Sequence, residues 1–409
     1  MVIRGLSEGR PYYYNSQDLF RDGYYRTIVP FPCNLLDTPI KNNRSSFCCD
    51  YRLTLGGSFD YLRNIYAMKT AHFTYNLPGE RIAQEPCESR DQSRMMVVRR
   101  REGTIDCLRF TDFPRYLEKG DALVINDSRV VPARLNGRKA SGGRVEVLLL
   151  EREEGSNRWL VLLRPARRVS RGTRIFFQDG AVGEVRERVD EKKWIIEFIL
   201  ADDVEAFLEA HGKAPLPPYI KRSDSDGRSS LDLERYQTIY AAVPGSVAAP
   251  TAGLHFSETT MAELKRRRVT VAPLTLHVGP GTFNPVETEE VEDHVMERER
   301  YDISEETANA INRARRVIAV GTTSVRAMEA SALKNGRVKP GEGTTDLFIY
   351  PGFRFKVTGG LLTNFHLPAS SLFLLVCAFG GVELMKRAYE TAVDEGFRFY
   401  SYGDCMLIL

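Results

Sequence analysis

The feature that most constrains the fold of this chain is a series of short β-type runs between Arg144 and Leu200. In order they read RVEVLLL, WLVLLR, TRIFF, GAVGEVRERV and WIIEFIL, and the turn clusters EEGSN, QDG and DEKK separate several of them. Closely spaced runs rich in β-branched and aromatic residues, bounded by turn residues, are typical of antiparallel β structure. This region therefore favours an antiparallel barrel or sandwich.

Helical and strand-like patterns alternate on both sides of this region. The buried-looking strand VIAVG (317–321) leads into an amphipathic helix expected to begin near Ser324, and such alternation is typical of layered α/β domains. The apolar run from Leu372 to Phe379 is far shorter than the roughly 20 residues of a membrane span, so it predicts a buried core helix. We therefore predict a multidomain α/β protein in which a layered α/β domain is interrupted by an inserted antiparallel β-barrel.

The predicted domain boundaries follow from these patterns. Residues 68–131 and 219–409 form the discontinuous α/β domain and residues 132–218 form the barrel, with the Pro-rich PLPPYIKR (215–222) marking the return crossing. Residues 1–67 hold eight of the eighteen tyrosines and show no sustained periodicity. We expect them to be a disordered extension or a gene-start artefact, with Met68 as the true start, and a regulatory or targeting tail is the alternative.

Charge and cysteine content exclude several classes of protein. The net charge is only +3, and residues 1–67 contribute eight basic against six acidic residues, which leaves +1 for the rest. Any polyanion must therefore be held by local basic patches. The seven cysteines form no CxxC pair, which argues against a zinc ribbon or a disulfide scaffold. Without a secretion signal, we expect a cytoplasmic protein with reduced thiols and no membrane association.

Two groups of basic residues are candidates for phosphate contact. One is RPARRVSRGTR (164–174), and the other precedes it in the chain. The guanidinium group of Arg donates two parallel hydrogen bonds and so suits phosphate, although a solvated hairpin remains the alternative for the first group. The members are Arg164, Arg167, Arg168, Arg171 and Arg174 in the first group, and Arg129, Arg134, Arg138, Lys139 and Arg144 in the second.

Three glycine-rich loops each contain a histidine beside small and hydroxyl residues. They are APTAGLHF (249–256), LTLHVGPGTF (274–283) and GGLLTNFHLP (359–368). Their histidines are candidates for proton transfer, because imidazole titrates near neutral pH, and packed core histidines are the alternative. No HExxH spacing supports a metal site with Asp293 and His294, and GxSxG does not occur.

The helix predicted after VIAVG begins with hydroxyl residues. Thr322, Thr323 and Ser324 follow Gly321 directly. Free backbone N–H groups at such a helix start can bind a carboxylate or a phosphate. An ordinary capped turn between strand and helix is the alternative.

Taken together, these segments resemble the S-adenosylmethionine:tRNA ribosyltransferase-isomerase family of queuosine biosynthesis. The resemblance covers almost the whole chain from residue 68 on. Its two departures are residues 1–67, to which nothing carries over, and Cys405, where the family usually has a small residue. The segments that carry it are IAQEP (82–86) with Arg90 and Arg94, NDSRVVPARLNGRKASGG (126–143), PLPPYI, YQTIY (236–240), VAAPTAGLHF, LTLHVGPGTFNPV, EDHVME (292–297), VIAVGTTSVRAMEA, DLFIYPGFRFKVTGGLLTNFHLP (346–368) and FRFYSYGD (397–404).

The resemblance implies an enzyme that transfers and isomerises the ribosyl part of S-adenosylmethionine. The acceptor would be a tRNA with 7-aminomethyl-7-deazaguanine at the wobble position, and the products would be epoxyqueuosine-tRNA, adenine and methionine. S-adenosylmethionine would be the ribosyl donor, no metal is expected, and the enzyme is expected to be a monomer. The alternatives are an S-adenosylmethionine-dependent RNA methyltransferase and a non-enzymatic tRNA-binding protein.

Site residues are predicted on the same basis, combined with the chemistry. Proton transfer is assigned to His255, His277, His366 and Asp404, and adenine stacking to Phe256, Phe283 or Phe365. Binding of S-adenosylmethionine is assigned to Thr251, Gly253, Gly279, Gly281, Thr282, Thr322, Thr323, Ser324 and Asn364, with the hydroxyls at the helix start taking the methionine carboxylate. Binding of tRNA is assigned to Arg129, Arg134, Arg138, Lys139, Arg167 and Arg168.

Overall fold

The computed structural model describes residues 4–7, 10–13, 67–200, 203–223, 227–283 and 285–409, without the side chains of residues 4–7, 10–13, 282 and 283. The chain divides into two compact units, Met1–Arg63 and Asn64–Leu409. In the first unit, β1 (Arg4–Ser7) and β2 (Arg10–Tyr13) pair antiparallel. The prediction of a disordered extension otherwise falls outside the described residues.

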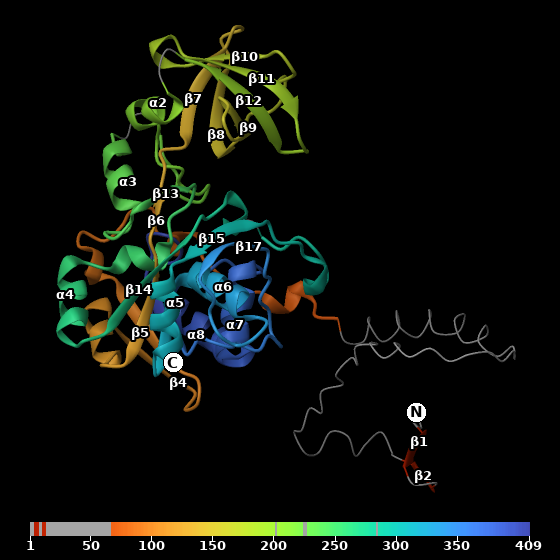
Figure 1. Ribbon diagram of the computed structural model, residues 1–409, viewed down its shortest axis with the longest axis vertical. Coiled ribbons are helices and arrows are strands. Elements are labelled where there is room, and N and C mark those ends of the chain that lie inside the picture. Colours follow the sequence, from red (N-terminus) through yellow and green to blue (C-terminus); the bar gives the residue numbers. More distant parts are fainter. Residues whose placement is uncertain (1–3, 8–9, 14–66, 201–202, 224–226, 284) are drawn as a thin grey trace, which may run out of the picture. The chain divides into compact units, whose positions relative to one another are not determined.

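A mixed sheet of nine strands forms the centre of the second unit, and Figure 1 shows it together with the helices that cover it. Its order is β17-β15-β14-β5-β16-β18-β19-β3-β4. The central strands β14, β5, β16 and β18 run parallel, whereas β19 pairs antiparallel with β18 and parallel with β3. The strands are β3 (Arg94–Arg99), β4 (Thr104–Arg109), β5 (Asp121–Asn126), β14 (Thr270–Leu276), β15 (Glu299–Ile303), β16 (Arg316–Val320), β17 (Gly341–Thr345), β18 (Gly360–Asn364) and β19 (Cys405–Ile408).

Helices cover both faces of this sheet, and its strands are therefore buried on both sides. Alternate residues of β3 belong to different cores, since Met96 and Val98 pack in one cluster and Met95 and Val97 in the other. The first cluster includes α5 (Glu305–Arg313), α6 (Gly321–Ala332), α7 (Ser371–Gly380) and α8 (Val382–Asp394). The second includes α4 (Glu258–Arg266) and the 3-10 helix Phe110–Tyr116. The predicted layered α/β domain is confirmed.

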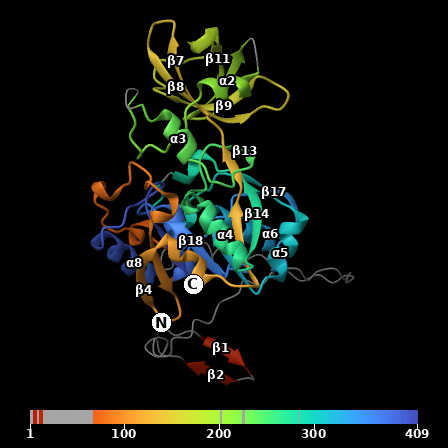
Figure 2. The same ribbon diagram turned by 90° about the vertical axis from the view of Figure 1, so that its left-hand side faces the viewer.

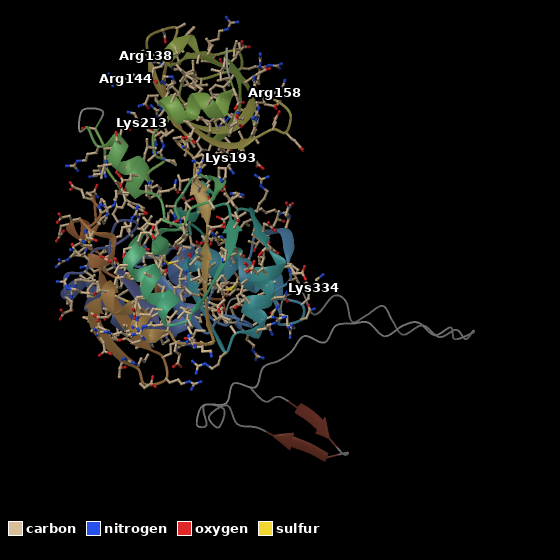
Figure 3. The ribbon with its side chains drawn as sticks, turned by 60° about the vertical axis from the view of Figure 1, so that its left-hand side comes forward. Arg138, Arg144, Arg158, Lys193, Lys213 and Lys334 are labelled. Atoms are coloured by element: carbon tan, nitrogen blue, oxygen red, sulfur yellow. The ribbon has the colours of Figure 1, made fainter. Side chains whose placement is uncertain are left out.

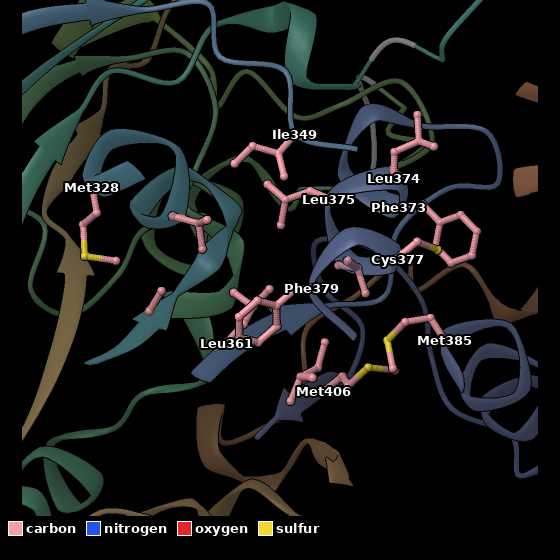
Figure 4. Close-up of a cluster of buried hydrophobic side chains, with 14 of the residues drawn as sticks. Met328, Ile349, Leu361, Phe373, Leu374, Leu375, Cys377, Phe379, Met385 and Met406 are labelled. Atoms are coloured by element: carbon pink, nitrogen blue, oxygen red, sulfur yellow. The ribbon is translucent and has the colours of Figure 1, made fainter. Parts of the chain in front are cut away.

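The helix α7 is the buried core helix that the sequence predicts. Figure 4 shows its side chains Phe373, Leu374, Leu375, Cys377 and Phe379 packed among residues of the sheet and of α8. Every one of these five side chains is at most 4% exposed. Burial of such side chains is the main term that holds α7 against the sheet.

The inserted region is a closed six-stranded barrel, which confirms the predicted β-barrel. Its order is β10-β11-β12-β9-β8-β7, and every neighbouring pair is antiparallel. The strands are β7 (Arg134–Lys139), β8 (Arg144–Arg152), β9 (Arg158–Arg164), β10 (Arg174–Phe176), β11 (Val182–Arg188) and β12 (Lys193–Ile199). The five predicted runs correspond to β8 through β12, and the sequence pattern missed β7.

Two connections join the barrel to the sheet domain, as Figure 2 shows. The strand β6 (Ser128–Val130) leads into the barrel and pairs in parallel with β13 (Val243–Ser246) on the way back. Between the barrel and β13 lie α2 (Val204–His211), the Pro-rich segment 215–222 and α3 (Ser229–Arg235). The barrel and the sheet domain belong to one compact unit, so the predicted domain boundaries stay a prediction.

Candidate active site

The topology gathers the ends of six strands at one edge of the central sheet. The parallel strands β14, β5, β16 and β18 have their carboxyl ends there, and the antiparallel relation of β19 to β18 places the start of β19 at the same edge. Because β3 runs parallel to β19, its start lies there too. Loops at the carboxyl ends of parallel strands are the usual place for ligand sites in α/β sheets.

A pocket lies among these loops. It comprises about 620 Å³ of space, part of it open to solvent. Segments from two of the three glycine-rich loops, one residue of the third and the start of α6 meet in it. The lining residues are Tyr219, Ala249, Pro250, Thr251, Ala252, Val278, Gly321, Thr322, Thr323, Thr363, Asn364, Phe365, His366, Leu367, Ser370, Leu372, Tyr400 and Ser401. We call it the nucleoside pocket, after the ligand that the family resemblance predicts.

The start of α6 forms one wall of the nucleoside pocket. The helix begins at Gly321, three residues before the predicted start, and the φ of +85° at Gly321 lets β16 turn directly into the helix. Thr323 accepts a hydrogen bond from the Nδ2 of Asn126 at 3.3 Å. The hydroxyl of Ser324 instead donates to the carbonyl of Val320 at 2.8 Å, and Ser324 is fully buried outside the lining. Of the three hydroxyl residues predicted at the start of this helix, Thr322 and Thr323 line the pocket.

Asn364, the last residue of β18, borders the pocket with an unsatisfied acceptor. Its Nδ2 lies 3.2 Å from the Nε2 of His255 and donates to the carbonyl oxygens of Tyr400 at 3.1 Å and Asp404 at 3.4 Å. These carbonyls can only accept, which fixes the orientation of the amide. The Oδ1 atom of Asn364 is buried without a partner in the described structure. Such an atom costs free energy unless a ligand or a water donates to it.

His255 lies behind Asn364 and does not line the nucleoside pocket. Its Nδ1 is 2.7 Å from the Oγ of Ser93, and the fixed amide of Asn364 requires Nε2 to accept, so the proton is on Nδ1. Burial, assisted by the positive charges of Arg398 and Arg90, lowers the pKa of His255 to about 3. The imidazole is therefore neutral near pH 7, and it contacts the pocket residue Asn364 through Nε2.

His366 is the histidine that borders the pocket itself. Its Nε2 is 2.7 Å from the Oγ1 of Thr363, and its backbone carbonyl accepts a hydrogen bond from the hydroxyl of Tyr75. Burial lowers the pKa of His366 to about 3, so it is also neutral near pH 7. Among the three predicted histidines it is the one with direct access to a ligand in this pocket.

Asp404, the fourth predicted proton-transfer residue, is held by backbone groups. Its Oδ1 accepts from the N–H of Arg94 at 2.9 Å, and its Oδ2 accepts from the N–H of Arg398 at 2.8 Å. The side chain is buried and does not line the nucleoside pocket. It ties the start of β3 to the loop before β19.

The other predicted residues of the first glycine-rich loop and the predicted stacking residues lie as follows. Thr251 lines the nucleoside pocket, whereas Gly253 packs against the hydroxyl of Tyr240. Phe256 is fully buried against Phe110 and Phe113 in the core below the sheet, so it has no face for stacking on a ligand. Phe365 lines the pocket, and the side chain of Phe283 lies outside the described structure.

The loop LTLHVGPGTF reaches the nucleoside pocket only through Val278. His277 is half-buried outside it, and its Nδ1 has no partner in the described structure. Gly279 and Gly281 line a separate hollow of about 370 Å³ with residues 294–297 and Glu299. At Gly281 a Cβ would lie 2.7 Å from a carboxylate oxygen of Glu297, so a larger residue would have to displace that side chain. The side chain of Thr282 lies outside the described residues.

The predicted phosphate-binding residues differ in how they are held. Arg129 pairs with Glu209 at 3.4 Å, and Arg134 pairs with Glu146 at 3.0 Å. Arg138 donates to the carbonyl of Gly142 at 3.3 Å, and Lys139 follows it in β7. Arg167 and Arg168 are exposed in the loop after β9, where Arg168 has a φ of 62°.

Three further pocket residues, Tyr219, Tyr400 and Ser401, lie in segments that carry the family resemblance. The sequence pattern indicates no role for them. The rings of Tyr219 and Tyr400 lie 4.5 Å apart, and the hydroxyl of Tyr219 is 2.7 Å from the Oγ of Ser401. Tyr400 has a φ of 73°, a conformation that is costly for an aromatic residue and that occurs preferentially at functional sites. The segments PLPPYI and FRFYSYGD contained these residues, but nothing in their pattern indicated that the two segments meet.

Two further observations concern the described part of the chain. It contains no group of three or more His, Cys, Asp or Glu side chains arranged to hold a metal ion. Among its helices, none has the length and apolar character that crossing a membrane requires. The absence of a metal, the cytoplasmic location and the monomeric state stay predictions.

Known proteins are similar to this chain over most of its length. A family described as "Queuosine biosynthesis protein" matches residues 70–408. The chain belongs to this family. The S-adenosylmethionine:tRNA ribosyltransferase-isomerase of Syntrophus aciditrophicus is 54% identical over 84% of this chain and 100% of its own length. The protein of the same name from Trichlorobacter lovleyi is 46% identical over 84% of this chain and 100% of its own length.

A solved structure is also similar. It is described as the crystal structure of S-adenosylmethionine tRNA ribosyltransferase from Thermotoga maritima at 2.00 Å resolution. That chain is 35% identical to this one, the match covers 83% of this chain and 100% of that chain, and the TM-score is 0.46. The assignment to the queuosine biosynthesis family rests on the sequence relatives.

Proposed function

We propose that this chain is an S-adenosylmethionine:tRNA ribosyltransferase-isomerase whose nucleoside pocket binds S-adenosylmethionine. The enzyme moves the ribosyl part of that molecule onto the 7-aminomethyl-7-deazaguanine base of tRNA and isomerises it. The products are epoxyqueuosine-tRNA, adenine and methionine. Relatives of this name at 46–54% identity, matched over their full length, support the activity.

The unpaired Oδ1 of Asn364 is the observation that carries the assignment of the pocket. This buried acceptor is open to a donor from a ligand or a water, and S-adenosylmethionine brings N–H donors in its ammonium and its adenine amino group. The start of α6 offers the opposite complement. The backbone N–H groups of its first turn have no partner within the helix, and Thr322 adds a hydroxyl. A carboxylate is stabilised there by the helix dipole, so we assign this wall to the methionine carboxylate.

Proton transfer in this pocket is assigned to His366. A sulfonium group acidifies the hydrogens on the neighbouring C5′ carbon, so a modest general base suffices. His366 is neutral and borders the pocket, which is the protonation state that a base requires. We assign His255 a positioning role, because it contacts the amide of Asn364 and not the pocket. Tyr219 and Tyr400 replace the predicted phenylalanines as the aromatic surface for adenine.

The structure gives less support to the predicted roles of the remaining site residues. Asp404 accepts two backbone N–H groups and is assigned a structural role. His277, Gly279 and Gly281 lie around the neighbouring hollow, and a role for them in binding the ribosyl donor would require the ligand to extend past Val278. For tRNA binding, Arg167 and Arg168 are favoured because they are exposed. Replacing both with Ala should weaken tRNA binding and its dependence on salt.

Product analysis tests the proposed function. The purified protein is incubated with S-adenosylmethionine and tRNA that carries the 7-aminomethyl-7-deazaguanine base, and the small molecules are separated by chromatography. We expect adenine and methionine in equal amounts, with an equal amount of modified base in the tRNA. Release of S-adenosylhomocysteine would identify a methyltransferase instead. No turnover of the cofactor, with tRNA still bound, would support a tRNA-binding protein without this activity.

A further inference from the structure

A second, smaller pocket adjoins the nucleoside pocket. It comprises about 280 Å³ of space, part of it open to solvent. Ser401 lines both pockets, and the contact between Asn364 and His255 joins them, because Asn364 lines the nucleoside pocket and His255 lines the second one. We call the second one the arginine pocket. Its lining residues are Pro86, Cys87, Arg90, Ser93, Arg235, Leu254, His255, Ser401, Tyr402 and Gly403.

The charged side chains of the arginine pocket are both cations. Its lining, all of it described, contains the guanidinium groups of Arg90 and Arg235 and no carboxylate. The other titratable groups of the lining are uncharged near pH 7, because burial raises the pKa of the Cys87 thiol and of the Tyr402 hydroxyl and lowers the pKa of His255. Two positive charges in a concave site attract an anion.

Backbone carbonyls hold Arg90 in place. Its guanidinium donates to the carbonyl of Leu254 at 3.3 Å and to the carbonyl of Glu234 at 3.1 Å. The carboxylate of Glu234 is exposed and attracts Arg90 from outside the lining. Burial, and next the positive charge of Arg235, lower the pKa of Arg90. The two guanidiniums therefore repel each other, and an anion bound between them would offset that repulsion.

Arg235, the last residue of α3, is held in the same way from the other side of the pocket. Its guanidinium donates to the carbonyls of Cys87 at 2.6 Å and Glu88 at 3.1 Å. A guanidinium has five N–H donors, so two printed contacts on each arginine leave three donors for a ligand or a water. In contrast, Arg158, which Figure 3 labels on the barrel, lies 3.9 Å from a carboxylate oxygen of Glu153.

The arginine pocket suits a single phosphate group. Guanidinium groups bind phosphate through parallel, charge-assisted hydrogen bonds, and here two of them are fixed by the backbone before a ligand arrives. In the proposed reaction the acceptor base must approach the nucleoside pocket. Because the arginine pocket adjoins it through Ser401, the phosphates of that nucleotide come close to the two arginines.

We propose that Arg90 and Arg235 bind one backbone phosphate of the nucleotide under modification in the arginine pocket. The inference rests on the proposed function for the identity of the RNA. It places a phosphate contact on the sheet domain, beside the reacting groups, in addition to the contacts predicted on the barrel.

The test compares binding of RNA by the full-length protein and its variants. The probe is a synthetic anticodon stem-loop RNA with an unmodified guanosine at the wobble position, and its dissociation constant is measured without S-adenosylmethionine at several salt concentrations. Arg235→Gln keeps amide N–H donors for the backbone carbonyls and loses the charge. It should lower the slope of log K against log salt by about 0.7, which corresponds to roughly fourfold weaker binding near 0.15 M salt. Arg235→Lys keeps the charge and should keep the slope.

Arg100→Gln is the matched control. The guanidinium of Arg100 also donates to backbone carbonyls, those of Phe379 at 3.2 Å and Gly359 at 3.0 Å. Arg100 follows the end of β3, at the opposite edge of the sheet, and does not line the arginine pocket. Its replacement should leave the dissociation constant and the salt slope unchanged. Thermal unfolding of each variant separates loss of binding from loss of folding.

A neutral linkage in the RNA identifies the phosphate without any change to the protein. Two further probes carry a single methylphosphonate, one on the 5′ side and one on the 3′ side of the wobble nucleotide. One of them should bind the unchanged protein about as weakly as the unmodified probe binds Arg235→Gln. The same probe should bind Arg235→Gln no more weakly still, because both changes remove one shared contact.

Three results would overturn the proposal. They are unchanged RNA binding by folded Arg235→Gln, unchanged binding of both neutral probes by the unchanged protein, and weaker binding of S-adenosylmethionine by Arg235→Gln with RNA binding intact. The last result would assign the arginine pocket to the methionine carboxylate. Failure of the unchanged protein to bind the unmodified probe would instead count against the proposed function, so the two failures are distinguishable.

Discussion

His255 either positions the amide of Asn364 or acts as a general base, and two substitutions of His255 distinguish these roles. His255→Gln places an amide oxygen where Nε2 lies and can still accept from Asn364, but it loses the contact with Ser93. His255→Asn places its amide where Nδ1 lies, so it keeps Ser93 and loses Asn364. Both variants leave one buried polar group unsatisfied, which costs about 1–3 kcal/mol of unfolding free energy in each case. Their stabilities should therefore be similar.

The kinetic result distinguishes positioning from catalysis. Loss of one neutral hydrogen bond, about 0.5–1.5 kcal/mol, loosens the amide of Asn364 in His255→Asn and should raise KM for S-adenosylmethionine roughly 2- to 12-fold. His255→Gln should keep KM near that of the unchanged enzyme, and kcat should change little in both. A general base contributes about 10²- to 10⁴-fold. A fall of kcat in that range in both variants, with KM unchanged, would refute the positioning role.

Three further outcomes follow from the described contacts. Burial lowers the pKa of His255 and His366 to about 3, whereas the same histidines in the unfolded chain have a pKa near 6.5. Between these two pH values the unfolded state binds more protons than the folded state. The unfolding free energy therefore falls as the pH is lowered. The slope from the two histidines is up to about 2.7 kcal/mol per pH unit, and urea unfolding of His366→Gln between pH 6 and 5 should show about half of it; an unchanged slope would contradict the burial of that imidazole. Glu329 is fully buried and accepts from the backbone N–H of Lys356 at 2.8 Å, so Glu329→Gln should cost about 1.5–3 kcal/mol in urea unfolding, and an unaltered midpoint would count against it. Thr322→Val should raise KM for S-adenosylmethionine several-fold with an unchanged Tm, and an equal KM would remove the start of α6 from the ligand site.

Much of the fold could be predicted from local sequence pattern. The five β-type runs correspond to β8 through β12 because β8 to β11 have alternating burial and β12 is a short apolar run, and turn clusters separate several of them. The strand β7 was missed because its sequence RLNGRK is polar outside and has glycine in place of an apolar side chain. At that glycine, Gly137, a Cβ would lie 2.5 Å from Ile175, so the residue that weakens the strand signal is also required to close the barrel.

The site was predictable in part, because its residues come from segments that only the topology brings together. Local patterns identified the start of α6 and the TNFHLP segment, and both line the nucleoside pocket. They could not show that β3 and β19, far apart in the chain, pair in parallel and bring Ser93 and Tyr400 to the same edge. Nor could they show that Val278 turns toward one pocket while Gly279 and Gly281 turn toward another.

The most direct test of the central claim is an experimental structure of the protein with bound S-adenosylmethionine. The ligand should occupy the nucleoside pocket, with an N–H donor within hydrogen-bond distance of the Oδ1 of Asn364 and the methionine carboxylate at Thr322. Binding of S-adenosylmethionine in the hollow of Gly279 and Gly281, with the nucleoside pocket filled only by water, would contradict the account.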